Sequence, residues 1–169
     1  SGQVRTRLEW NDRDFALGRA DLAHLLRTRV RVVGTPHQTT KVVVEAQDSR
    51  LFGEETSTLG DGSGDQIDFH QAYLKVESIF DHPVDLTLGR QEVIYGGQRI
   101  VGAVGWHNVG RSFDAAKVRI GKSSYVDLFN AKLQESGRLN RNLYGLLGHL
   151  ERPVRVIWEP YLLFEHDKN

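Results

Sequence analysis

Arginine residues recur at alternate positions in two segments of the chain. One row consists of Arg5 and Arg7, and the other of Arg27, Arg29 and Arg31, with Thr or Val between neighbours. Because successive side chains of a β-strand point to opposite faces, each row would lie on one face of a strand. A guanidinium group is a planar fork of donors that matches the two oxygens of a carboxylate. The spacing therefore predicts a surface that binds carboxylates repeatedly.

An alternation of period two extends over most of the chain and predicts an all-β fold. In the first segment Val4, Thr6, Leu8 and Trp10 share one face, and charged residues take the other. The nine candidate strands are Val4–Trp10, Leu26–Val32, Lys41–Ser49, Ile67–Ile79, Val84–Glu92, Phe113–Ile120, Tyr125–Leu133, Leu143–Leu150 and Val154–Glu165. Pro160 lacks a backbone donor, so we expect a bulge or a strand end there.

The connections between these strands alternate in length. The short ones are Gly34–Gln38, Asp81–Pro83, Gly121–Ser123 and Glu151–Pro153. The long ones are Asn11–Asp21, Arg50–Gln66, Val93–Ser112 and Gln134–Arg141. An antiparallel up-and-down transmembrane β-barrel, with tight turns at one end and longer loops at the other, predicts this pattern.

Composition excludes several other classes. Lys plus Arg and Asp plus Glu are both 22, so no global charge favours nucleic acid as a partner. No cysteine is present, and the histidines lack zinc-site spacing, so we expect no cofactor, no metal and no enzyme activity. No apolar run reaches the ~20 residues of a membrane-spanning helix.

A series of short motifs in the middle of the chain is more specific. In order they are Gln47–Gly53, Gln71–Leu74, Leu88–Gln91, Tyr95–Gly102, Trp106–Asn108 and Gly110–Asp114. This series, which covers Gln47 to Asp114, resembles the alginate-export family of outer-membrane porins. The resemblance implies an eighteen-stranded barrel in the bacterial outer membrane, whose basic lumen passes an anionic polysaccharide. Candidate partners are that polysaccharide, outer-membrane lipid and periplasmic export components.

Nine strands would make up about half of such a barrel. Bacterial single-chain barrels generally have an even strand number, because an open edge in lipid leaves backbone groups unpaired. We therefore expect residues 1–169 to form a single barrel segment, the N-terminal portion of a larger barrel.

If the apolar face contacts lipid, the opposite face lines the lumen with an excess of cations. The acidic residues of that face are Glu9, Glu45, Glu77 and Asp85. The candidate substrate-binding residues, which include the loop residues discussed next, are Arg5, Arg7, Arg27, Arg29, Arg31, Lys41, Lys75, Arg90, Arg99, Trp106, Asn108, Arg111, Lys117 and Arg119. The alternative is that cations and carboxylates pair across neighbouring strands and only solvate the lumen.

The long Val93–Ser112 segment leaves two interpretations open. Its arginines and Trp106 suit a loop that folds into a pore and contacts sugars. An exposed loop whose tryptophan anchors at the lipid interface would have the same composition. Tyr73, Tyr144, Tyr161 and Trp158 are likewise either girdle or lumen aromatics.

Other functions remain as alternatives. Asp61–Asp68 spaces oxygen ligands like a calcium loop but lacks its glycine and terminal glutamate, so a flexible loop is the better hypothesis. A soluble carbohydrate-binding or lipocalin-like β domain would also show alternating strands. A nonspecific porin, or a structural sleeve for a partner protein, would keep the barrel and change its task.

Overall fold

The computed structural model describes residues 1–11, 21–52, 65–136, 139–151 and 157–168. Within these ranges the chain forms strands and one short 3₁₀ helix, η1. The elements are β1 (Gly2–Asn11), β2 (Asp21–His37), β3 (Thr40–Phe52), β4 (Asp65–Val76), η1 (Ile79–Asp81), β5 (Val84–Gln91), β6 (Phe113–Gly121), β7 (Tyr125–Ser136), β8 (Leu139–Glu151), β9 (Ile157–Trp158) and β10 (Tyr161–Lys168). The predicted all-β class is confirmed.

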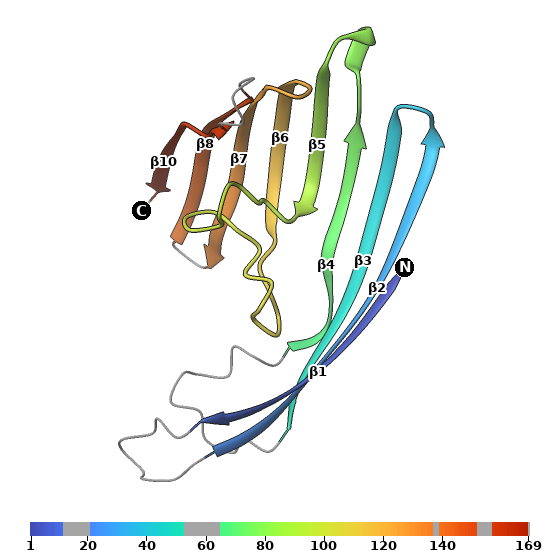
Figure 1. The fold of residues 1–169 in the computed structure, drawn as a ribbon, viewed down its shortest axis with the longest axis vertical. Helices are drawn as coiled ribbons and strands as arrows, with labels where there is room; N and C mark the ends of the chain where they lie inside the picture. The colour runs from blue at the N-terminus through green and yellow to red at the C-terminus, as the bar shows by residue number, and fades with distance from the viewer. Residues whose placement is uncertain (12–20, 53–64, 137–138, 152–156, 169) are drawn as a thin grey trace.

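The strands form one curved antiparallel sheet in chain order (Figure 1). Each strand pairs with the next along the chain, from β1 to β8, and β8 pairs with both β9 and β10. β1 and β10 lie at the two edges, so the sheet is open. This is the up-and-down topology predicted for a barrel wall. No helix in the described ranges has the length and apolarity needed to cross a membrane.

The two faces of the sheet differ in chemistry because side chains alternate along each strand. On β3, Val43, Glu45 and Gln47 are buried, whereas Val42 and Val44 between them are exposed. The face that carries Val43, Glu45 and Gln47 is called the inner face below. The outer face exposes large apolar side chains, among them Val32, Leu162 and Phe164, which are 62 to 69% exposed. Exposed apolar surface on this scale is typical of a face covered by lipid or protein.

Three of the four predicted short connections lie between successive strands, but two of them have other bounds. β2 continues to His37, through most of the predicted Gly34–Gln38, and the connection that contains Asp81–Pro83 runs from residue 77 to residue 83. Residues 152 and 153 of the fourth lie outside the described ranges. β2 and β3 are joined by residues 38 and 39, and β6 and β7 by residues 122 to 124, at the same end of the sheet (Figure 1). Gly121 ends β6 with φ of 110°, and a Cβ there would lie 2.2 Å from the carbonyl oxygen of Ser124. Only glycine fits this approach of the two strands.

Two predicted boundaries among the last strands had opposite outcomes. The predicted long connection Gln134–Arg141 is wrong, because β7 continues to Ser136 and β8 begins at Leu139. The residues at these strand ends are polar, a composition that is also typical of loops, and for this reason the sequence pattern indicated a loop. The strand end predicted at Pro160 is confirmed, and the ninth candidate strand is accordingly two strands, β9 and β10, in one register against β8. The Pro160 carbonyl still accepts a hydrogen bond from the Gly148 amide (2.8 Å).

Candidate functional site

Five arginines lie together on the inner face of β1 and β2. We call Arg5, Arg7, Arg27, Arg29 and Arg31 the arginine row. Strand register places Arg5 directly opposite Arg27. Arg27 in turn lies opposite Ser49, and Arg31 lies opposite Glu45, on the inner face of β3. The register therefore places these side chains on one face, as predicted.

The connection between β5 and β6 lies against this face. Residues 92–112, called the covering segment, leave β5 and cross the sheet before entering β6 (Figure 1). Arg5 donates hydrogen bonds to the carbonyl oxygens of Gly105 (2.8 Å) and His107 (3.0 Å). Arg7 donates to the carbonyl oxygen of Trp106. The guanidinium groups thus bind main-chain oxygens, which occupy the position that anionic oxygens could take.

Further arginine contacts extend this arrangement along the segment. Arg27 donates to the His107 carbonyl oxygen (3.2 Å), and Arg29 donates to that of Val109 (3.2 Å). The Arg7 guanidinium carbon also lies 4.7 Å from the ring centre of Trp106. Of the two interpretations left open by the sequence, the structure favours a loop that folds inward, because the covering segment lies against the inner face of the sheet.

Neutral side chains of β3 complete the attachment. Gln47 donates to the Val109 carbonyl oxygen (2.7 Å), and the Ser49 hydroxyl donates to that of Asn108 (3.2 Å). The Asn108 side chain, 1% exposed, donates to the carbonyl oxygens of Leu26 (3.4 Å) and Arg50 (3.3 Å). A buried amide that meets strand carbonyls fixes the segment at this point. Asn108, predicted to bind substrate, is therefore engaged with the wall.

The first half of the covering segment packs on β6, β7 and β8 through an apolar core. Its members are Val93, Val101, Phe113, Ala115, Phe129, Ala131 and Leu147. Tyr95 stacks on the Phe129 ring at a centroid distance of 5.8 Å. The Phe129 ring lies flat because Gly145 opposite has no side chain, and a Cβ there would be 2.0 Å from the ring. The core holds the segment by hydrophobic burial.

One buried carboxylate links the segment to the wall. Asp127, 0% exposed, accepts two hydrogen bonds from Arg119, both 2.8 Å. It also accepts one from the Tyr95 hydroxyl (2.9 Å). The pKa of Tyr95 is raised, first by burial and then by the charge of Asp127, so the phenol stays protonated and donates. Arg119 is thus an inner-face cation, as predicted, but it is paired.

Several other predicted cations are also paired. Arg29 and Arg31 lie 3.6 and 3.9 Å from Glu45 oxygens. Lys41 and Lys75 both lie 2.7 Å from Glu77, in the connection after β4. Hydrogen bonds from these two lysines lower the Glu77 pKa to about 2. Cross-strand pairing, the alternative to substrate binding, thus applies to part of the set.

A second carboxylate sits at the start of the covering segment. Glu92 hydrogen-bonds His70 (2.8 Å) and lies 3.5 Å from Arg29. Its pKa is lowered, chiefly by the hydrogen bond with His70 and further by the charges of His70, Arg29 and Arg31, against the opposing effect of burial. The segment therefore carries a charge that complements the arginine row.

Three of the predicted cations have side chains that are not paired in this way. The side chains of Arg99, Arg111 and Lys117 make no hydrogen bond or ion pair with another described residue. Arg99 and Arg111 are also exposed and so remain available to a ligand, whereas Lys117 is only partly exposed. Arg90 is placed elsewhere, because strand parity puts it with Leu88 on the outer face, where it pairs with Asp114 (2.9 Å). Its grouping with the lumen residues is not supported by the register.

The aromatic residues divide between the two faces. Tyr73 is on the inner face, where its hydroxyl accepts a hydrogen bond from Arg31 (3.0 Å). Tyr161 lies opposite Leu147 and shares the inner face. Tyr144 and Trp158 lie on the outer face and are 44 and 63% exposed. Within the described ranges there is no cluster of metal ligands, and residues 61–64 of the calcium-like loop lie outside these ranges.

Sequence reasoning missed several of the residues that attach the covering segment. Gln47 and Ser49 share the alternation of Glu45, a signal that could have placed them on the inner face. Tyr95, Glu92 and Asp127 carried no such signal, because their contacts join positions up to 32 residues apart.

Comparison with known proteins gave one match. The profile of the alginate export family matches residues 1–136, most of the chain. No curated protein and no solved structure matched.

Proposed function

The chain belongs to the alginate export family, and from that premise we propose that it forms part of the wall of an outer-membrane channel for an anionic polysaccharide such as alginate. The observation that carries the proposal is the sorting of charge between the two faces of the sheet. Arginines gather on the inner face, and apolar side chains cover the outer face. Lipid would contact the apolar face, and the polymer would pass along the basic one.

The proposed mechanism is passive and needs no catalytic group. A polyuronate carries one carboxylate per sugar, so a row of guanidinium groups can exchange partners as the chain advances. The arginine row already binds a line of carbonyl oxygens from residues 105–109. We propose that polymer carboxylates bind the same donors once the covering segment has moved away from the arginine row. Before it moves, this segment narrows the pore.

Neutralising the whole row would be a poor test, because Arg5, Arg7, Arg27 and Arg29 also hold the covering segment. A cleaner variant combines Arg31→Gln with Lys117→Gln, since neither side chain hydrogen-bonds that segment. In planar bilayers under a salt gradient, the wild-type channel should be anion-selective, and the double variant should shift the reversal potential toward cations. The matched control is Arg90→Gln on the outer face, which should leave selectivity unchanged.

An unselective wild-type pore, or equal shifts in the double variant and the control, would refute the proposal. A nonspecific porin would conduct without block by alginate. A soluble β domain would stay monodisperse without detergent and form no pore.

A further inference from the structure

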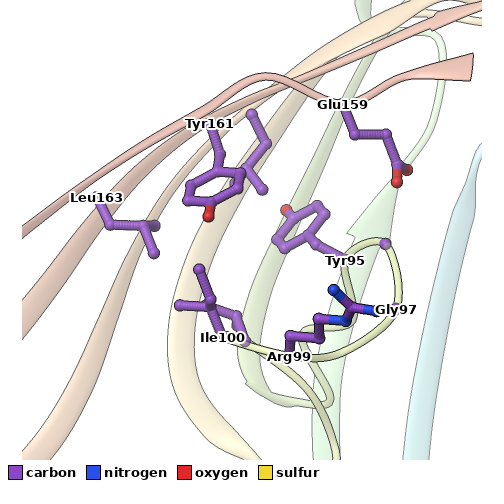
Figure 2. A pocket seen from close by; sticks show the side chains of 10 residues that line it. Tyr95, Gly97, Arg99, Ile100, Glu159, Tyr161 and Leu163 are labelled. Carbon is purple, nitrogen blue, oxygen red and sulfur yellow. The ribbon is translucent and has the colours of Figure 1, made fainter.

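A cavity of about 280 Å³ lies between the covering segment and the edge of the sheet (Figure 2). Residues 95–101 form one side. The other side is formed by Leu147 of β8 and by Glu159, Tyr161 and Leu163 at and beside β10. Strand register puts Leu147, Tyr161 and Leu163 on the inner face, so the cavity belongs to the same side of the sheet as the arginine row. Its volume is near the lower limit for ligand pockets, ~300 Å³, which suits one sugar unit.

The lining combines apolar and polar groups in the way that sugar recognition requires. Leu147 and Val101 are buried and form an apolar floor. Tyr161 points from β10 toward the segment, and the Tyr95 ring stands beside it (Figure 2). Aromatic faces cover the C–H surfaces of a pyranose, and a tyrosine hydroxyl can still hydrogen-bond. These groups provide contact area without charge selectivity.

Arg99 contributes a cationic group to the lining. Its guanidinium lies next to Gly97 and below Tyr95 in Figure 2. It has no hydrogen bond or ion pair with a described residue, in contrast to the arginine row. An arginine fork at a sugar-sized cavity is suited to a sugar carboxylate.

Glu159 supplies the complementary acceptor. Its carboxylate is 3.1 Å from His149 Nδ1 and so close to Gly96 that a Cβ there would lie 2.9 Å from it. A carboxylate accepts hydrogen bonds from sugar hydroxyls and repels a second carboxylate. Arg99 and Glu159 would therefore orient a sugar that has an acid group at one position and hydroxyls at the others.

We propose that this cavity is a binding subsite for a single uronate unit, with Arg99 binding the carboxylate, Glu159 accepting hydroxyls, and Tyr95 and Tyr161 flanking the ring. The inference rests on the proposed polyuronate channel and adds a discrete sugar site to it, separate from the arginine row. A channel with such a site would bind short uronate oligomers saturably.

The test measures binding and conduction separately. Full-length protein folded in detergent is titrated with alginate trisaccharide by calorimetry, with neutral mannotriose as the control sugar. Loss of one charged hydrogen-bond partner at a partly exposed site should weaken trisaccharide binding about 10-fold in Arg99→Gln. Because the Arg99 side chain makes no hydrogen bond or ion pair with a described residue, the substitution should leave the fold intact. Arg111→Gln is the matched control: it removes another exposed arginine of the same segment, outside the cavity, and should change binding less than ~2-fold.

A second variant, Tyr161→Ala, should also weaken trisaccharide binding. Equal weakening by the Arg99 and Arg111 variants, equal binding of mannotriose, or no binding by a protein that conducts anions would each overturn the subsite and leave the channel standing. Saturable binding that depends on Arg99, in a protein that forms no anion-selective pore, would support the subsite and overturn the channel. Absence of both binding and conduction would overturn both.

Discussion

The Tyr95 hydroxyl should make a measurable contribution to the attachment of the covering segment. Tyr95→Phe keeps the ring that stacks on Phe129 and removes only the hydrogen bond to Asp127. The acceptor is a buried carboxylate, and a hydrogen bond to a charged group contributes about 1.5 to 3 kcal/mol. Two bonds from Arg119 remain on Asp127, so we expect the lower part of this range. About 1.4 kcal/mol corresponds to a tenfold change in the population of the detached segment.

Hydrogen exchange measures this population without reference to transport. The amides of Tyr95, Gln98 and Arg111 donate to carbonyls within the segment, to Val101, Tyr95 and Ala103 respectively. If these bonds are lost when the segment detaches, peptides covering residues 95–111 should exchange about tenfold faster in Tyr95→Phe. The control is Tyr144→Phe, which removes a hydroxyl from the outer face. Exchange at the wild-type rate in Tyr95→Phe, or the same acceleration in the control, would refute the reasoning.

Two further predictions concern the wall itself. Gly145→Ala should displace the Phe129 ring and lower the free energy of unfolding in urea by about 1 to 3 kcal/mol, whereas Gly34→Ala, where a Cβ meets nothing within 4 Å, should not destabilise by this amount. Glu77 should confer acid sensitivity: its folded pKa of about 2 lies below the unfolded value, so its contribution to stability is complete above that unfolded value and is lost as pH falls toward about 2. Stability measured between pH 5 and pH 2 should show this loss in the wild type, and Glu77→Gln should remove this part of it.

Sequence was sufficient for the features that depend on local alternation. Each strand follows a period of two, so the inner-face position of Arg27, Arg29 and Arg31 follows from strand assignment alone. The break at Pro160 follows from its missing donor. Arg90 departs from the predicted set because the strand register puts it with Leu88 on the outer face. The strand ends near Ser136 and Leu139 were lost because polar residues there resemble a loop.

The covering segment could not be predicted in this way, because its course depends on contacts between distant positions. Ser49 meets Asn108 across 59 positions, and Arg5 meets His107 across 102. Hydrogen bonds to carbonyl oxygens leave no pattern in the sequence, since every residue has a carbonyl. Only the length of the connection and its glycines indicated that it could fold back.

The inner-face cations differ in role according to the groups that they bind. Arg5, Arg7 and Arg27 bind the covering segment, so their substitution would alter its position as well as the charge of the wall. Arg119 and Lys75 are paired with acidic residues, so they add less to the net field than their number suggests. Lys117 and Arg99 lack such partners among the described residues. A measurement of selectivity can therefore be read as charge at Lys117, Arg99 and Arg31, whereas at Arg5, Arg7 and Arg27 it also reports whether the segment remains attached.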